Sequence, residues 1–307
     1  MQATYLPPAR VPAQWFEPTG TSAPVPVPFL DEDEATMAVA AATSVLHRGR
    51  LAATQVRRIA VSSRTGTGLA PTIAAALGVA PERVEESAAI LFGQTHVGTP
   101  GEGPVLLIQT EAPRPGRVPS EGVGKGAFAV AKLSGPGIAA DGDVRLGADP
   151  FSLERDVVDK LAQWERDATR RVTMGAYIPA ATWQRSLGAR YRLEGATCPQ
   201  GHVSYPPRTL CPACGSPSTS VPLPRPGTVE TYTVVAKGAG PSEYDPWQSV
   251  AGEYAVVVAR FGAARVPGVW TDAPTSSLRI GARVEPVFRR LFGQDGEWRY
   301  GLKLRPA

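Results

Sequence analysis

The sequence predicts two regions of different class: a layered α/β region on the N-terminal side and a small all-β region on the C-terminal side. Helix-type and strand-type patterns alternate over residues 1–150, which is typical of helices packed on a sheet. All three cysteines lie at 198–215, in CPQGHVSYPPRTLCPACG, and five strand-type segments follow a Pro-rich connector. We therefore expect domains at 1–150 and 221–307, joined by a helical connector at 151–195 and a cysteine-containing ribbon at 196–220.

Length and composition indicate a globular chain. Its 307 residues suffice for two hydrophobic cores, and 43% hydrophobic and 20% charged residues are ordinary for a soluble protein. No apolar run is long enough to span a membrane, and the N-terminus MQATYLPPARVPAQWFEP lacks the basic start and apolar stretch of a secretion signal. Three cysteines at metal-type spacing then indicate a reducing, cytoplasmic compartment.

The net charge of +4 is unevenly distributed along the chain. Residues 190–307 contain 14 Lys and Arg against 9 Asp and Glu, a balance of +5, whereas residues 1–189 contain 18 against 19, a balance of −1. This excess could attract an anionic ligand such as a phosphate-bearing cofactor or nucleic acid. An ordinary solvated surface explains a charge of this size equally well.

Local patterns predict the elements of the N-terminal region. DEDEATMAVAAATSVL at 31–46 predicts a helix, because acidic residues precede Ala-rich turns and HRGR places basic residues at the end. A second helix is predicted at 69–79, where Gly78 stops it. The Pro-rich residues 1–30 look extended, and strand-type runs predict strands at 56–63, 103–111 and 123–133.

The segment 151–172, FSLERDVVDKLAQWERDATRRV, predicts an amphipathic helix. Apolar residues at spacings of three and four form one stripe, made of Leu153, Val157, Leu161, Trp164, Ala168 and Val172. The stripe is expected to pack on the protein's own core or on a partner.

The residues after SPSTSVPLPRPG predict a small barrel. WRYGLKLR alternates most clearly, with Trp298, Tyr300, Leu302 and Leu304 on one face and charged residues on the other. Five short strands with a long second connection are typical of a five-stranded barrel of the OB type. The predicted strands are 228–236, 254–261, 264–271, 283–290 and 298–305.

The cysteine spacing predicts a metal site. Cys211 and Cys214 form a C-x-x-C turn, which lets two sulfurs reach one ion. Cys198 begins a second turn, but Gly201 stands where its partner should be and His202 follows. Imidazole is a good zinc ligand, and glycine can absorb the extra residue with a positive φ. We expect Cys198, His202, Cys211 and Cys214 to form a closed, structural Cys₃His zinc site.

The alternative is a ribbon without metal, held by packing of Tyr205 and the two prolines after it. Arg208, in the same loop, either reaches an anion or braces the ribbon against the barrel. His96 is either a remnant acid–base group or a structural residue, and His47 at a helix end favours the helix dipole.

Residues 180–307 resemble a known family. YRLEGATCPQGHVSYPPRTLCPACG, followed by GTVETYTVV and LRIGARVEPVF, is similar to the zinc-ribbon/OB-fold proteins that accompany acyl-CoA thiolases and related condensing enzymes. The resemblance implies structural zinc, a condensing-enzyme partner and bound acyl-CoA, with Arg208 as a candidate contact to the CoA phosphates. Gly201 and His202 depart from the usual four-cysteine pattern, which puts the metal in question but not the fold.

The N-terminal half resembles the thiolase fold. YLPPARVP, DEDEATMAVAAATSVL, APTIAAALGV and GVGKGAFAVAKL are similar to pieces of it, closest to archaeal-type hydroxymethylglutaryl-CoA synthases. That superfamily uses a cysteine nucleophile, but no cysteine precedes Cys198, and Gly93 or Gln94 stands near the expected position. The chain is also too short for a second thiolase half. The resemblance therefore implies a degenerate thiolase-like domain.

Three functions follow from these observations. The first is a non-catalytic accessory subunit that docks on a thiolase or ketosynthase and helps bind or channel acyl-CoA. The second is an OB-fold protein that binds single-stranded nucleic acid, but Trp298 and Tyr300 fall on an apolar strand face and Lys and Arg form no runs. The third is a stand-alone acyl-CoA enzyme, which the missing nucleophile disfavours.

Overall fold

The computed structural model describes residues 1–12, 25–29, 31–63, 68–87, 103–112, 127–139, 142–146, 150–168, 178–236, 248, 250, 252–294 and 297–307. The chain forms two compact units, Met1–Asp159 and Lys160–Ala307, and each is described by itself. Among the helices in these ranges, none combines the length and the apolar character needed to cross a membrane.

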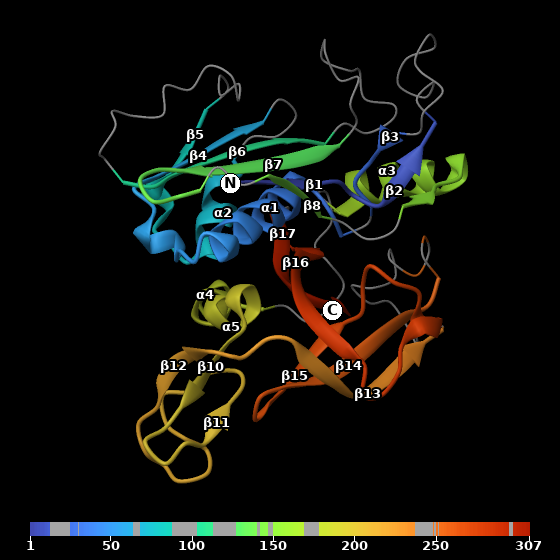
Figure 1. Ribbon diagram of the computed structural model, residues 1–307. Coiled ribbons are helices and arrows are strands. Elements are labelled where there is room, and N and C mark those ends of the chain that lie inside the picture. The colour runs from blue at the N-terminus through green and yellow to red at the C-terminus, as the bar shows by residue number, and fades with distance from the viewer. Residues whose placement is uncertain are drawn as a thin grey trace. The chain divides into compact units, whose positions relative to one another are not determined.

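The first unit is built on a mixed six-stranded sheet with the order β5-β4-β6-β7-β1-β8 (Figure 1). Strands β4, β5 and β6 are parallel, whereas β7 runs antiparallel to both of its neighbours, β6 and β1. A small second sheet has the order β3-β2-β9. The bounds are β1 Gln2–Tyr5, β2 Ala9–Val11, β3 Val25–Pro26, β4 Arg58–Ser63, β5 Val84–Glu86, β6 Val105–Glu111, β7 Phe128–Ser134, β8 Asp143–Leu146 and β9 Phe151–Ser152.

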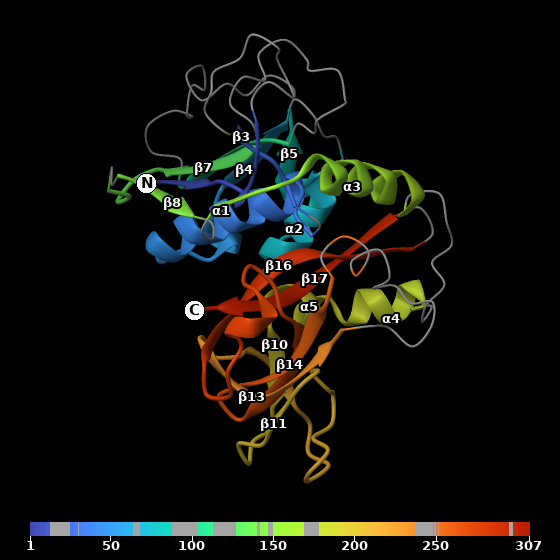
Figure 2. The same ribbon diagram turned by 90° about the vertical axis from the view of Figure 1, so that its right-hand side faces the viewer.

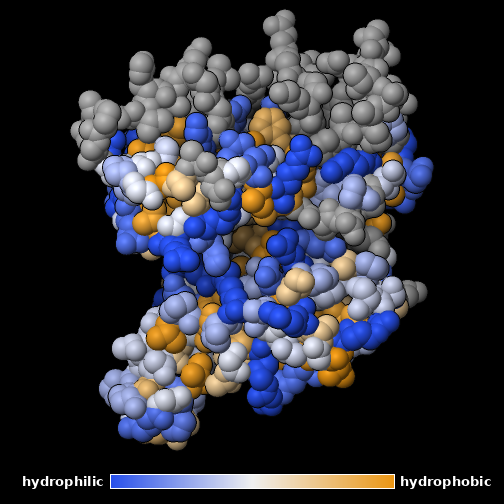
Figure 3. Space-filling view, viewed as in Figure 1, coloured by the Kyte–Doolittle hydropathy of each residue, from blue (hydrophilic) through white to orange (hydrophobic). Residues whose placement is uncertain are grey.

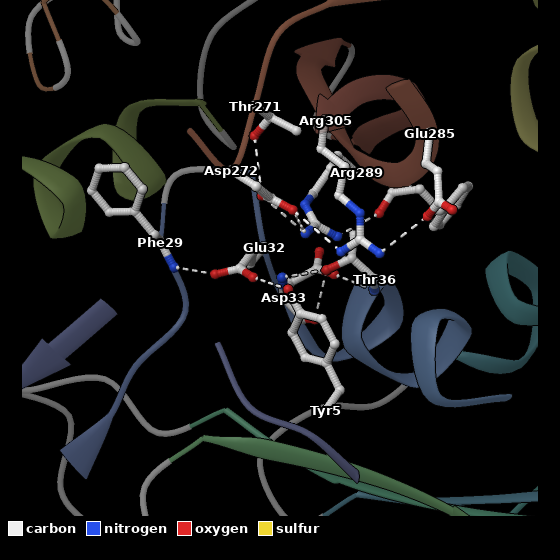
Figure 4. Close-up of polar contacts among 11 residues, drawn as sticks. Tyr5, Phe29, Glu32, Asp33, Thr36, Thr271, Asp272, Glu285, Arg289 and Arg305 are labelled. Carbon is white, nitrogen blue, oxygen red and sulfur yellow. Dashed lines mark hydrogen bonds and ion pairs between the residues drawn. The ribbon is translucent and has the colours of Figure 1, made fainter. Parts of the chain in front are cut away.

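Two helices, α1 (Glu34–Arg48) and α2 (Ala70–Leu77), lie on one face of this sheet (Figures 1 and 2). Helix α1 begins with a reciprocal cap, in which Asp33 accepts from the Thr36 N–H at 2.9 Å and the Thr36 hydroxyl accepts from the Asp33 N–H at 2.8 Å. Just before it, Glu32 accepts hydrogen bonds from the Tyr5 hydroxyl and the Phe29 N–H (Figure 4). These bonds tie β1 to the start of α1.

The structure confirms a layered α/β arrangement in the first half. The helices predicted at 31–46 and 69–79 are α1 and α2, and the three predicted strands are β4, β6 and β7, although residues 123–126 lie outside the described part of the last one. The Pro-rich start, predicted only as extended, contributes β1 to the main sheet and β2 and β3 to the small one. Short 3₁₀ helices also occur at Ala53–Gln55 and Pro81–Arg83, and in the second unit at Thr275–Ser277.

The described part of the connector, 151–168 and 178–195, forms three helices: α3 (Arg155–Ala168), α4 (Ala180–Arg185) and α5 (Leu187–Arg192). Helix α3 confirms the predicted helix, and Leu153 just before it is buried while Val157 is half-buried. The side chains of the other stripe residues, Leu161, Trp164, Ala168 and Val172, lie outside the described set. The boundary between the compact units falls inside α3, and the four-part domain division stays a prediction.

The second unit contains an antiparallel five-stranded sheet with the order β15-β14-β13-β16-β17. A parallel bridge between Trp270 and Leu304 also links the end of β15 to β17, the other edge of the sheet. Its core includes Val229, Val257 and Phe261, which are buried. All five predicted C-terminal strands are present: β13 Gly227–Val235, β14 Tyr254–Phe261, β15 Ala264–Val269, β16 Arg283–Gln294 and β17 Glu297–Pro306.

The long hairpin β16–β17 packs against α4 and α5 through aromatic rings. Trp183 of α4 lies edge-on to Phe292 at 6.1 Å and carries the guanidinium of Arg190 4.6 Å from its ring centroid. On the same unit, Asp272 binds Arg289 at 2.9 Å and lies 3.6 Å from Arg305 (Figure 4). These contacts hold the β16–β17 hairpin in place within the second unit.

Candidate metal centre

A small three-stranded sheet carries the cysteines. Strands β10 (Glu194–Thr197), β11 (Val203–Ser204) and β12 (Thr219–Pro222) pair antiparallel in the order β11-β10-β12 (Figure 1). The first turn joins β10 to β11, and the second lies in the segment between β11 and β12. The sheet therefore presents two separate turns to one another.

The first turn brings His202 into the place of a missing cysteine. The Gly201 N–H donates to the Cys198 carbonyl at 2.9 Å, and the Cys198 N–H donates to the His202 carbonyl at 3.1 Å. Gly201 has φ +80°, a left-handed conformation that other residues adopt with strain. His202 thus stands one residue later than the second cysteine of a C-x-x-C turn would. Its imidazole, which is longer than a cysteine side chain, extends back toward the Cys198 sulfur.

The second turn is a regular knuckle. The Gly215 N–H donates to the Cys211 carbonyl at 2.9 Å, and Gly215 has φ +70°. Backbone N–H groups of Ala213 and Cys214 donate to the Cys211 sulfur, just as those of Gln200 and His202 donate to the Cys198 sulfur. Donors of this kind stabilise thiolates, but at Cys211 burial outweighs them and raises the pKa of the thiol.

The four predicted ligands converge on one point. Their ligand atoms all lie within 4.8 Å of one another. His202 Nδ1 is 3.5 Å from Cys198 Sγ and 3.7 Å from Cys211 Sγ, and Cys214 Sγ is 3.7 Å from Cys198 Sγ. Zinc bonds of about 2.3 Å to sulfur and about 2.0 Å to nitrogen require S–S edges of about 3.8 Å and S–N edges of about 3.6 Å in a tetrahedron. The cluster therefore fits zinc, with Nδ1 as the nitrogen donor.

The electrostatics of the cluster also favour a cation. Hydrogen bonds from Ser216 lower the pKa of Cys214 to about 6, so this thiol is largely ionised at neutral pH. Burial would raise the pKa of Cys198, but the backbone donors of His202 and Gln200 outweigh it and lower the pKa. Hydrogen bonding to Cys214, and next to Cys198, raises the pKa of His202. The negative charge favoured on the Cys198 and Cys214 sulfurs therefore attracts a cation.

Apart from the ligands, the two turns have almost no interior. Within 198–215, all of which the structure describes, only Cys198 and Cys211 are buried. The packing alternative relied on Tyr205 and the prolines, but Tyr205 and Pro207 are half-buried and Pro206 is exposed. The Tyr205 hydroxyl donates to the Ala189 carbonyl at 3.2 Å, so this ring attaches the ribbon to α5 instead of filling it.

None of the other candidate residues that the structure describes belongs to the group of four clustered side chains. Arg208 is exposed, and its guanidinium has no hydrogen bond or ion pair to any described residue, so no brace to the barrel is seen. His47 lies in the last turn of α1, as predicted. His96, Gly93 and Gln94 lie outside the described residues.

A C-x-x-C turn predicts backbone N–H groups that point at its sulfurs, and the structure has such donors in both turns. Their signal is the repeated C-P-x-x pattern, CPQG at 198–201 and CPAC at 211–214, in which each proline follows the first ligand and the next N–H groups turn inward. Ser216, whose hydroxyl and N–H both bind Cys214, has no such signal because it lies beyond the motif.

Comparison with known proteins shows which families contain similar sequences. Residues 185–220 match the family model described as the ChsH2 rubredoxin-like zinc ribbon domain. A DUF35 domain-containing scaffold protein of Pyrococcus furiosus is 31% identical over 140 residues, covering 43% of this chain and 96% of that protein. A protein of the same description from Methanothermobacter thermautotrophicus is 32% identical over 130 residues, covering 41% and 93%. The predicted resemblance to a zinc-ribbon family is confirmed.

Among solved structures, a chain of the Ltp2-ChsH2(DUF35) aldolase aligns with a TM-score of 0.32 and 20% identity, over 43% of this chain and 98% of that one. MvaS in complex with 3-hydroxy-3-methylglutaryl coenzyme A aligns with a TM-score of 0.34 and 16% identity, over 44% of this chain and 38% of that one.

Proposed function

We propose, on the premise that the chain belongs to the DUF35 domain-containing scaffold proteins, that it is a non-catalytic accessory subunit of a thiolase-type or ketosynthase-type condensing enzyme. The observation that carries this proposal is that the chain matches nearly the full length of relatives described as scaffold proteins. A scaffold needs rigid surfaces more than a reactive group. A metal-held ribbon on a closed sheet supplies such surfaces.

The second unit would be an OB-type barrel with a structural zinc ribbon. The sheet order and the bridge between Trp270 and Leu304 support closure, because that bridge joins the two edges of the sheet. In the ribbon, Cys198, His202, Cys211 and Cys214 would hold zinc, which supplies no open position for substrate. Its role is to fix the ribbon loops as a docking element.

The first unit would be the degenerate thiolase-like domain. Its helices on one face of a mixed sheet support a layered fold, and the absence of any cysteine before Cys198 removes the nucleophile of that superfamily. Acyl-CoA would then be bound together with the partner enzyme. Arg208, an exposed guanidinium with five unused donors, is the candidate contact for a CoA phosphate.

The partner is the first test. Co-expression with the condensing enzyme encoded nearest to its gene is expected to give a defined complex in size-exclusion chromatography and a higher rate of CoA release than the enzyme alone. The same enzyme expressed without this chain is the control. Separate elution of the two proteins, together with unchanged turnover, would contradict the proposal.

A second test concerns covalent chemistry. Incubation of the isolated chain with acetyl-CoA is expected to leave its intact mass unchanged, because the superfamily's nucleophile is missing. A known thiolase treated identically should gain one acetyl group. A stoichiometric adduct mapped to residues 1–170 would show an unforeseen nucleophile and would favour the stand-alone enzyme.

A further inference from the structure

Three arginines lie in one row across the outer face of the five-stranded sheet. The register pairs Arg265 of β15 with Arg260 of β14, Arg260 with Thr228 of β13, and Thr228 with Arg283 of β16. Cross-strand partners share a face of the sheet, and all four residues are exposed. We call these four residues the arginine row.

A β-bulge in β13 supplies the carboxylate that binds two of the three arginines. The register of β13 shifts between Val229 and Thr231, so that Glu230 is the extra residue. Its carboxylate binds Arg260 and Arg265, each at 2.7 Å. Hydrogen bonding from Arg265, and then from Arg260, lowers the pKa of Glu230 to about 2, so the carboxylate is charged at neutral pH.

The row nevertheless keeps a positive surplus. Three guanidiniums face one carboxylate, which leaves a charge of +2, and Arg260 and Arg265 keep unused N–H donors. The guanidinium of Arg283 has no hydrogen bond or ion pair to any residue that the structure describes. The side chains are 50% and 66% exposed at Arg260 and Arg265. The row therefore offers oriented donors to an anion from outside.

The next rows on the same face are uncharged. Thr231 pairs with Val258, which pairs with Pro267, and Thr233 pairs with Val256, a residue that is 37% exposed. No side chain in these two rows is aromatic. Single-stranded nucleic acid is bound by stacking bases on aromatic rings, so this face suits a protein better than a nucleic acid.

We propose that the arginine row and the Thr/Val rows beside it form a docking surface for an extended, acidic segment of a partner protein. Neighbouring strands are about 4.8 Å apart, so the row from Arg265 to Arg283 spans about 14 Å. An extended segment with carboxylates at alternate positions places three of them over about 13 Å, which matches the row. This surface is independent of the condensing-enzyme partner proposed above.

The test uses the full chain and a fluorescent seven-residue peptide in which glutamates alternate with threonines. Binding is measured by anisotropy at low ionic strength, where the screening length is about 30 Å, and again near 0.15 M salt, where it is about 8 Å. We expect saturable binding that weakens with salt. The same peptide with glutamine in place of glutamate should not bind.

Arg283→Glu is the decisive variant, because the Arg283 guanidinium makes no hydrogen bond or ion pair with a described residue, so the change should not disturb the fold. Reversing one charge replaces an attraction by a repulsion, and we expect the Kd to rise about tenfold. Arg185→Glu, the same charge change at an exposed position of α4, is the matched control and should stay within about twofold of wild type.

Three outcomes would overturn the proposal: no binding of the glutamate peptide by wild type, equal loss in the Arg283→Glu and Arg185→Glu variants, or tighter binding of a single-stranded oligonucleotide of equal charge than of the peptide. Thermal unfolding of both variants at the wild-type temperature shows that each is folded, so a loss confined to Arg283→Glu identifies the surface.

Discussion

Replacing Cys211 with serine is expected to release zinc and unfold the ribbon at 194–222, while the five-stranded sheet stays folded. Cys211 is one of only two buried residues in the two turns, so a bound metal would take the place of a hydrophobic core there. Binding of structural zinc contributes about 10–16 kcal/mol in small ribbons, far more than this packing could. Metal analysis should fall from about one zinc per chain to less than about a tenth.

Limited proteolysis measures the unfolding. New cleavage sites within 198–215 are expected in the Cys211→Ser variant and in wild type treated with a chelator, whereas the fragment from 227 to 307 should resist. Pro212→Ala, next to the ligand and exposed, is the matched control and should keep its zinc. Wild type that carries no zinc and yet resists cleavage in these turns would overturn the metal centre.

The fourth ligand is tested in the same assay. Imidazole Nδ1 of His202 lies 3.5 Å from Cys198 Sγ and 3.7 Å from Cys211 Sγ, which are separations expected between ligands of one zinc ion. His202→Ala should therefore weaken zinc binding, while His202→Cys should retain part of it through a thiolate at the same position. Equal zinc affinity of wild type and His202→Ala would assign the fourth ligand elsewhere.

Phe261→Ala is expected to destabilise the second unit by about 3–5 kcal/mol, because it removes a fully buried ring and leaves a cavity. The cavity cannot close easily, since Phe261 lies so near Gly227 that a Cβ there would be 2.6 Å from the ring. Chemical unfolding followed by tryptophan fluorescence measures the loss. The matched control, Val256→Ala, removes methyl groups from the outer face of the same strand and should change the stability by less than about 1 kcal/mol.

Similar stability of the two variants would contradict this assignment of the core. It would mean that the face carrying Phe261 is not the interior of the sheet, and the register that places Arg260 outside would be wrong as well. The core prediction and the docking surface thus depend on the same strand alternation.

Local sequence determined several of the helices and strands of this protein. Helix α1 is predictable because its cap, Asp33 and Thr36, and its Ala-rich face lie within a few residues of one another. Strand β17 was predictable from the alternation of apolar and charged residues at 298–305, although Lys303, on the charged face, is buried in the structure. The spacing of the cysteines indicates three of the four proposed ligands. His202 was predicted because it follows Gly201, the glycine that lets the turn bend late.

Only the tertiary structure decided which distant segments meet. Strand β1, which looked merely extended, pairs with β7 and β8, more than a hundred residues away, because its backbone groups find partners there and no nearby pattern announces it. The arginine row joins Arg260, Arg265 and Arg283 only through the strand register. Two ligands that lie within four residues of each other in the chain are brought together by the geometry of one turn. A row across four strands depends instead on how whole strands align, which local sequence does not encode.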